Sequence, residues 1–439
     1  MLAQFLLFTF ALSETNIINT EVNRKYSIKD DLIVVNVLVK VLNQGEPFSK
    51  YTFTIPDREN QHIGHTTASF STNNIRSFDK SLPISVNGNE YTVDLQKEIP
   101  NGEEFTLYFS YTLGDYLLFI KQKVSLNQRI QLYFNTTKFF KSKYETRKSS
   151  LSISGIPKAS ITTPKHILED SGIRIQSSMI ILKDLTNDDG SDFEIEFTTS
   201  RPMIRIDQII SQTTVSHWGK TKQKAFYSVT NAGPKFTGEF NRIDFNPRTT
   251  PCFTQSIEMR PPKGARNFWA SDESGLLQKE LSLTGDNLLI PLRGPMLSSW
   301  KATFTAGWTI DTSVFVSGGY RFESPLITKC VSAPVTEVVA EFVLPEGAVV
   351  VDVQVPIDAN VTKFIQPHNL DLNGRTVVRI EADHLSTEDD VPVVISYHLS
   401  AHYHFLKILT LSVAFVIVFV AIIVARRFDC GIANKQKTQ

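Results

Sequence analysis

Residues 408–425 read ILTLSVAFVIVFVAIIVA, an uncharged run in which only Thr410 and Ser412 are polar. At 1.5 Å of rise per residue, a helix of this length extends about 27 Å, close to the ~30 Å hydrocarbon core of a bilayer. A core helix of a soluble protein would keep a polar face, and this run has none. We therefore expect residues 405–425 to form a transmembrane helix to which the rest of the chain is attached.

Basic residues gather on one side of this run. Arg426 and Arg427 follow it at once and two lysines lie further on, whereas only Lys407 precedes it closely. Because Lys and Arg are enriched on the cytosolic side of membrane spans, this asymmetry predicts that residues 426–439 form a short cytosolic tail. The roughly four hundred preceding residues would then stand outside the cytosol.

The N-terminus is consistent with export. Residues 1–13 are apolar and too short to span a bilayer, and Ala11 and Ser13 form a small-x-small pattern ahead of Glu14. These features predict a signal peptide over residues 1–13, although a positively charged start is missing. The alternative is a buried first strand; the membrane span downstream favours the signal peptide.

Composition excludes some classes of function. Lys plus Arg and Asp plus Glu balance at 45 each, so no strong field favours nucleic acid as a partner. The apolar content of 41% is ample for packed cores. Removing both ends leaves about 390 residues, a length typical of two or three domains.

Covalent modification of the exported part is suggested by two kinds of residue. Cys252 and Cys330 would share an oxidising compartment, where we expect a disulfide between them; two free thiols are the alternative. Cys430 would lie in the cytosolic tail. Asn135 and Asn360 begin Asn-x-Thr tripeptides and are possible N-glycosylation sites.

Period-2 alternation of apolar residues, with turn signals every ten to fifteen residues, predicts a mainly β fold. A first series of expected strands covers residues 31–41, 50–55, 105–113, 130–134, 151–156 and 193–197, and residues 84–95 are expected to form a hairpin about Asn87-Gly88. A second covers residues 204–210, 223–229, 238–245, 299–309, 335–344, 349–355, 375–380 and 391–398. We expect antiparallel, sandwich-like pairing in two domains, residues 14–200 and 201–404. The proline-rich stretch 248–282 is expected to be a long irregular excursion.

Catalytic motifs are missing from the sequence. It contains no H-E-x-x-H, no G-x-S-x-G and no glycine-rich phosphate loop. Asp272 and Glu273 have the chemistry for acid–base catalysis, but a solvated turn is the simpler interpretation. The sequence therefore predicts no catalytic residue, no metal site and no cofactor.

An ordered series of motifs resembles the ribophorin I family. The series comprises Ser216-His217-Trp218-Gly219, a Gly-x-Phe-x-Arg-x-Asp-Phe element over residues 238–245, Ala265 to Gly275, Pro291-Leu-Arg, Trp300-Lys301 and Leu344-Pro-Glu-Gly347. The likeness extends from about Asp31 to the end of the apolar run and is weaker in the first half. Two departures occur: Leu276 stands where the family usually has Asn after Asp-Glu-x-Gly, and Ser298-Ser-Trp300 replaces Gly-Gly-Trp.

The resemblance implies a non-catalytic subunit of the oligosaccharyltransferase complex in the endoplasmic reticulum membrane. That complex transfers a preassembled glycan from dolichol pyrophosphate to Asn of Asn-x-Ser/Thr, and its chemistry belongs to a multi-span catalytic subunit. Partners implied are this catalytic subunit, other subunits including a small membrane subunit, and nascent polypeptides. We expect His217, Trp218, Asp272 and Glu273 to contact partners or acceptors, although packing roles would explain His217 and Trp218 equally well.

Two other classes of protein share the predicted layout. A single-pass cell-surface adhesion or receptor ectodomain would have the same signal peptide, β-domains and span, but usually more disulfides. An ectoenzyme with a β-rich front part, as in aminopeptidases, would need a zinc-binding motif that is missing here.

Overall fold

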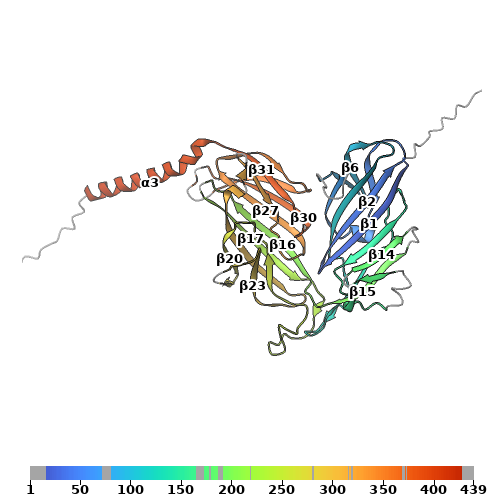
Figure 1. Ribbon diagram of the computed structural model, residues 1–439. Helices are drawn as coiled ribbons and strands as arrows, with labels where there is room; N and C mark the ends of the chain where they lie inside the picture. Colours follow the sequence, from blue (N-terminus) through green and yellow to red (C-terminus); the bar gives the residue numbers. More distant parts are fainter. Residues whose placement is uncertain are drawn as a thin grey trace, which may run out of the picture.

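A computed structural model describes residues 16–71, 81–164, 173–176, 179–185, 191–217, 219–278, 281–314, 316–317, 320–367, 371 and 373–427. The expected signal peptide, most of the expected cytosolic tail, Cys430 and Trp218 lie outside the described residues. The described part is mostly β-strand, with one long helix, α3 (Ala401–Arg427), at its C-terminal end. This confirms the mainly β fold class with a C-terminal apolar helix. Figure 1 shows α3 leaving the molecule beside β31.

The first half of the chain builds one eight-stranded sheet with smaller sheets around it. Its main path is β13 (Arg174–Gln176), β14 (Met179–Leu185), β12 (Ser149–Ser154), β1 (Ile17–Lys29), β2 (Leu32–Asn43), β7 (Glu104–Gly114) and β4 (Ile63–Ser71), with β11 (Glu145–Thr146) beside β1. Two three-stranded sheets accompany it: β3 (Phe48–Thr54), β6 (Glu90–Ile99) and β5 (Ile84–Asn87); and β15 (Asp192–Thr199), β10 (Ile130–Thr137) and β8 (Leu118–Phe119).

The second half contains another eight-stranded sheet. Its order is β21 (Gly275–Leu276), β20 (Arg266–Asp272), β24 (Lys301–Asp311), β17 (Lys220–Asn231), β16 (Ile204–Thr214), β27 (Pro334–Glu346), β30 (Arg375–Ser386) and β29 (Asn360–Gln366). Accompanying sheets are β19 (Thr254–Met259), β23 (Asn287–Met296) and β22 (Leu283–Thr284); and β25 (Val316–Ser317), β26 (Arg321–Pro325), β31 (Pro392–Leu399) and β28 (Ala348–Gln354). Short helical turns are α1 (Asp57–Asn60), η1 (Lys158–Ser160) and η2 (Thr312–Val314).

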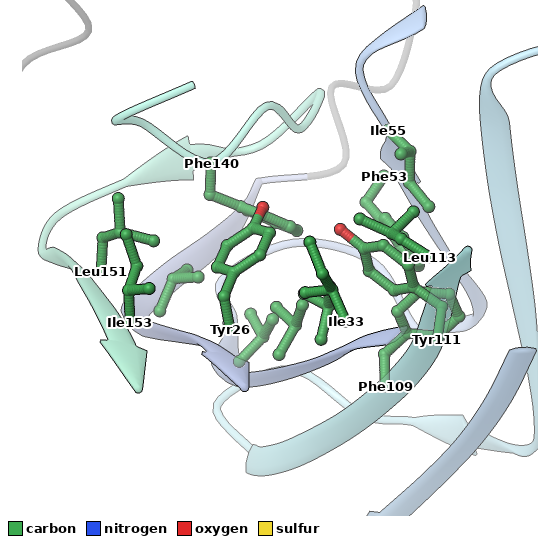
Figure 2. Close-up of a cluster of buried hydrophobic side chains, with 14 of the residues drawn as sticks. Tyr26, Ile33, Phe53, Ile55, Phe109, Tyr111, Leu113, Phe140, Leu151 and Ile153 are labelled. Atoms are coloured by element: carbon green, nitrogen blue, oxygen red, sulfur yellow. The ribbon is translucent and has the colours of Figure 1, made fainter. Parts of the chain in front are cut away.

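Two clusters of buried side chains form the interior. Along β2, Ile33, Val35, Val37, Val39 and Val41 are all buried, because every second residue of a strand faces the same side. Figure 2 shows the neighbouring aromatic and aliphatic side chains of this first core. Its members end at Met203, with Cys252 added from later in the chain. The second core starts at Ile204 and includes Trp308 and Tyr397. The domain limits 14–200 and 201–404 remain a prediction.

The two units meet through polar contacts and one short sheet. Lys29 pairs with Glu388 at 3.1 Å, and Asp115 lies 3.7 Å from Arg205. β9 (Lys123–Val124) pairs in parallel with β18 (Lys235–Phe236). Parallel pairing also occurs between β1 and β12 and between β16 and β27, whereas the sequence led us to expect antiparallel pairing. The two large sheets are therefore mixed.

Two local expectations are wrong. Residues 238–245 do not form a strand: the Asn241 side chain accepts from the Ile243 N–H at 3.0 Å and donates to Asp244 at 2.9 Å. Such local side-chain bonds compete with a sheet ladder and favour a turn. Conversely, the stretch 248–282, expected to be irregular, contains β19, β20 and β21. Its prolines, Pro251, Pro261 and Pro262, lie outside these strands, where no ladder N–H is needed.

The expected disulfide is also absent. Cys252 and Cys330 are free thiols. Cys252 is buried in the first core and its Sγ lies 3.4 Å from the Thr199 carbonyl oxygen. Cys330 packs against the second core, and its backbone forms an isolated antiparallel β-bridge with that of Met259. The two cysteines belong to different cores, so spacing along the chain gave no information about their distance in space.

Candidate functional site

Asp272 is the last residue of β20, and Glu273 begins the turn of the β20–β21 hairpin. The Ser274 N–H donates to Asp272 Oδ1 at 2.8 Å, which closes the turn locally. Arg293 of β23 donates to both carboxylate oxygens, with Nη2 2.8 Å from Oδ1, and Nη2 also reaches the Gly275 carbonyl at 3.2 Å. A fork of this kind is the strongest geometry for an Arg–carboxylate pair. Glu273 is exposed beside it.

The Arg293 hydrogen bonds hold the pKa of Asp272 below its ordinary value. A carboxyl that donates or accepts protons near neutral pH needs a raised pKa, because it must be partly protonated there. Asp272 has the opposite shift and a fixed partner. The Asp272–Arg293 ion pair therefore has a structural role, because it links the hairpin to β23.

The same hairpin presents apolar surface at the end of the eight-stranded sheet. Trp269 lies across from Gly307 of β24, and a Cβ added at Gly307 would approach the indole to 2.6 Å. The indole therefore covers the glycine backbone directly. Trp269 remains 38% exposed and Leu276 is 60% exposed. Together with Asp272 and Glu273, these residues make the β20–β21 hairpin a candidate contact surface.

His217 lies elsewhere, in an aromatic cluster at the other end of the second unit. Its Nε2 is 2.7 Å from the Tyr397 hydroxyl, and its ring packs against Tyr320 and Tyr397 at centroid distances of 5.8 and 5.9 Å. Burial raises the pKa of Tyr397 to about 12, so its hydroxyl keeps its proton at physiological pH. The cluster ties the loop after β16 to β31, which leads into α3.

Strand register separates the two candidate places. Lys220, three residues after His217, pairs with Asp311 of β24, whereas Ser271, beside Asp272, pairs with Thr305. Six residues along a strand correspond to about 20 Å. The structure therefore does not bring His217 together with the acidic hairpin. Trp218 lies outside the described residues.

Buried polar residues such as Glu59 and Asn231 could not be found from the sequence. Glu59 accepts hydrogen bonds from the hydroxyls of Tyr26, Tyr111 and Thr136 at 3.0, 2.6 and 2.7 Å. In Figure 2 the two tyrosine hydroxyls point toward one another, away from the apolar layer. The completely buried Asn231 donates to the carbonyls of Cys252 and Met296. A lone polar residue in a turn or at a strand end gives no pattern by which it could be found.

The two sequons occupy different surroundings. Asn360 is exposed at the start of β29, and Thr362 is exposed with it. Asn135 is half-buried in β10, which pairs with both β15 and β8. The hydroxyl of Thr137, the third residue of that sequon, donates to the Phe139 carbonyl at 3.1 Å. The fold leaves room for a glycan more readily at Asn360.

The described residues contain clefts between the units but no clustered metal ligands. No group of three or more His, Cys, Asp or Glu side chains gathers there as a metal site. A cleft of about 480 Å³ lies between the two units, lined by residues that include His62, Asp115, Arg205 and His384. It does not contain any of the four residues singled out from the sequence.

Comparison with known proteins decides the family. The Ribophorin I family model matches residues 17–426. The chain belongs to the ribophorin I family. Its relatives include dolichyl-diphosphooligosaccharide–protein glycosyltransferase subunit 1A of Arabidopsis thaliana, 25% identical over 99% of this chain and 74% of the relative. The corresponding subunit 1 of Schizosaccharomyces pombe is 23% identical over 87% of this chain and 88% of the relative.

Solved structures add little to this family assignment. A zinc metallopeptidase of the M1 class from Deinococcus radiodurans is similar over 45% of each chain, with 8% identity and a TM-score of 0.26. A likeness at this level carries no argument about function.

Proposed function

We propose that this chain is a non-catalytic subunit of the oligosaccharyltransferase complex of the endoplasmic reticulum, supporting N-linked glycosylation. The observation that carries the proposal is the family match over residues 17–426. Two relatives matched over most of this chain are named as subunit 1 of the dolichyl-diphosphooligosaccharide–protein glycosyltransferase. The adhesion alternative has no support among the relatives.

The proposed topology is a single-pass type I membrane protein with its β-units in the lumen. Within the described ranges, residues Ile408–Arg427 are the one helical segment long and apolar enough to cross a membrane. Arg426 and Arg427 at its C-terminal end favour the cytosol for that side. The signal peptide expected at residues 1–13 would direct the preceding residues to the lumen.

The proposed role is to brace the complex and to present acceptor chains. Extended polypeptides can add to an exposed sheet edge through main-chain hydrogen bonds. The β20–β21 hairpin lies at one end of the second eight-stranded sheet, with Trp269 and Leu276 exposed beside it. Its acidic turn, braced by Arg293, supports a binding function better than a chemical one, because Asp272 stays ionised and paired. Expected partners are the multi-span catalytic subunit, a small membrane subunit and nascent chains.

Depletion and rescue test the proposal. Depleting the protein is expected to leave glycoproteins underglycosylated while lipid-linked glycan accumulates, because transfer is impaired and donor synthesis is not. Rescue with Asp272→Ala or His217→Ala is expected to lower complex assembly or acceptor range. Asp286→Ala, an exposed acid in the neighbouring β22–β23 turn, is the matched control and should rescue fully.

One outcome separates bracing from chemistry. If Asp272→Ala assembled normally but all transfer were lost, the non-catalytic role would be wrong. If depletion changed neither glycoproteins nor the lipid-linked donor, the complex assignment itself would fail.

A further inference from the structure

A groove opens where the two main sheets of the second unit end side by side. β28 is the edge strand of the four-stranded sheet and β29 is the edge strand of the eight-stranded sheet. The Thr376 hydroxyl donates to the Ala348 carbonyl at 2.7 Å, which joins the two sheets at the floor. The groove above has a volume of about 420 Å³. Its walls include Val349, Phe364, Ile365 and Tyr403, here called the apolar rim.

The rim is unusually exposed for its chemistry. Val349 is 66% exposed, Ile365 is 68% exposed and Phe364 is 40% exposed. All seven residues of β29 are exposed. Apolar surface of this kind is unfavourable in water, and gathered apolar side chains commonly mark an interaction site.

The rim is continuous with the start of α3. Tyr403 belongs to the first turn of α3, and its ring lies directly against Gly347, which has φ of 75°. The Tyr403 hydroxyl also accepts a hydrogen bond from Asn373 at 3.2 Å. The apolar span begins at Ile408, five residues later, or about 7.5 Å along a helix. The polar layer on each side of a bilayer's hydrocarbon core is about 5–7.5 Å thick, so Tyr403 lies at the outer boundary of that layer.

The composition of the rim fits a lipid surface. It combines Val, Ile and Phe with a tyrosine, the residue type enriched where membrane proteins cross the interface. Lys363 lines the same groove and is exposed, and a lysine there can keep its ammonium group among headgroups while its stem lies along apolar surface. We propose that the apolar rim rests in the interfacial layer of the leaflet that α3 enters. This rests on the proposed membrane span and goes beyond the proposed subunit role.

Site-specific labelling of the full chain in lipid vesicles tests this contact. In a chain whose Cys252, Cys330 and Cys430 are replaced by Ser, the single variants Val349→Cys and Ile365→Cys would carry a polarity-sensitive fluorophore. Lipids with a quencher near the headgroup would report contact with the interface. Ile243→Cys is the matched control for exposure in water. Ile243 is 90% exposed and lies in the chain that follows β17. The last residue of β17, Asn231, is about 37 Å along the strand from its first residue, Lys220, which lies near the α3 end. Val416→Cys, in the middle of α3, reports insertion of the helix.

We expect at least a twofold greater quenching at positions 349 and 365 than at position 243, with a blue-shifted emission. Val416→Cys labelled chain should be quenched by a deep quencher. If position 416 is quenched while positions 349 and 365 behave like position 243, the rim contact is overturned and the span stands. If the labels at positions 349 and 365 are not quenched by lipid in vesicles but are shielded from water in the intact complex, the rim contacts a partner subunit instead of lipid. Loss of quenching at position 416 would overturn the span and, with it, the rim contact.

Discussion

At the scale of single residues, buried polar groups hold the first core in one arrangement. Glu59 is 1% exposed, and three hydroxyls donate to its carboxylate. Replacing it by Leu removes the acceptor and leaves Tyr111 without that bond. Because each buried unsatisfied group costs about 1–3 kcal/mol, we expect Glu59→Leu to lower the free energy of unfolding by about 3 kcal/mol. Thermal unfolding in detergent, followed by circular dichroism, measures the change.

Asp57→Asn is the control for the Glu59 variant, because Asp57 lies in the same helical turn and is exposed. Its stability should change by less than about 0.5 kcal/mol. If Glu59→Leu were as stable as the Asp57 variant, the hydrogen-bonded carboxylate would have no part in holding the core together.

Asp31 makes stability depend on pH. Burial first, and then the charge of Asp115, raises the pKa of Asp31 to about 8, and Oδ2 has no hydrogen-bond partner among the residues that the structure describes. The unfolded pKa is about 3.9, so between these values the folded chain binds a proton that the unfolded chain has lost. Stability contributed by this proton is therefore lost as pH rises from about 4 toward 8. We expect Asp31→Asn to raise the melting temperature at pH 8 more than at pH 5.

The comparison of pH values isolates this group, because other titrating residues are shared by parent and variant. An Asp31→Asn variant with the same pH profile as the parent would mean that the carboxyl titrates normally in the fold.

At the scale of elements, the β20–β24 pair depends on a glycine. A Cβ at Gly307 would lie 2.6 Å from the Trp269 indole, so Gly307→Ala must displace the ring. Overpacking of this kind costs about 1–3 kcal/mol. We expect reduced stability and a red shift of tryptophan emission as the indole moves toward water. Gly294→Ala in β23 is the matched control, because no heavy atom lies within 4 Å of its added Cβ. Equal emission spectra for both variants would contradict the packing of Trp269 on Gly307.

Elements with clear alternation could be predicted from the sequence, and the others could not. The Asn87-Gly88 signal correctly placed the β5–β6 hairpin, and the apolar run at residues 31–41 became β2. Residues 238–245 include three apolar residues and were expected to form a strand, yet side-chain bonds of Asn241 fold them into a turn. β29 was missed because all its residues are exposed, so no buried face marks it. Alternation of apolar and polar residues indicates a strand with one buried face, so it cannot reveal a strand that has no buried face.

Candidate site residues were predictable only in part. The resemblance singled out Asp272, but its partner Arg293 lies 21 residues away on another strand, where no local pattern links them. The Cys252–Cys330 expectation failed for the same reason, because sequence spacing does not say which core a residue joins.

At the scale of the whole molecule, a lumenal orientation should leave a glycan at Asn360. This residue and Thr362 are exposed on β29, whereas Asn135 is half-buried within a sheet. We expect Asn360→Gln to remove an endoglycosidase-sensitive shift in gel mobility, with Thr362→Ala giving the same result and Asn135→Gln a smaller one. Protease added to sealed microsomes should trim only the residues after Arg427. Cleavage within the β-units under those conditions would contradict the orientation.

Membership of the oligosaccharyltransferase complex is the central claim, and affinity capture of the tagged full chain from mild detergent tests it most directly. We expect a multi-span glycosyltransferase subunit to copurify in constant ratio, together with glycan-transfer activity toward an Asn-x-Thr peptide. A tagged chain truncated before residue 405, which lacks the membrane helix, should recover less of both. Recovery of the full chain without the multi-span subunit or transfer activity, from membranes whose complex remains intact, would contradict the account.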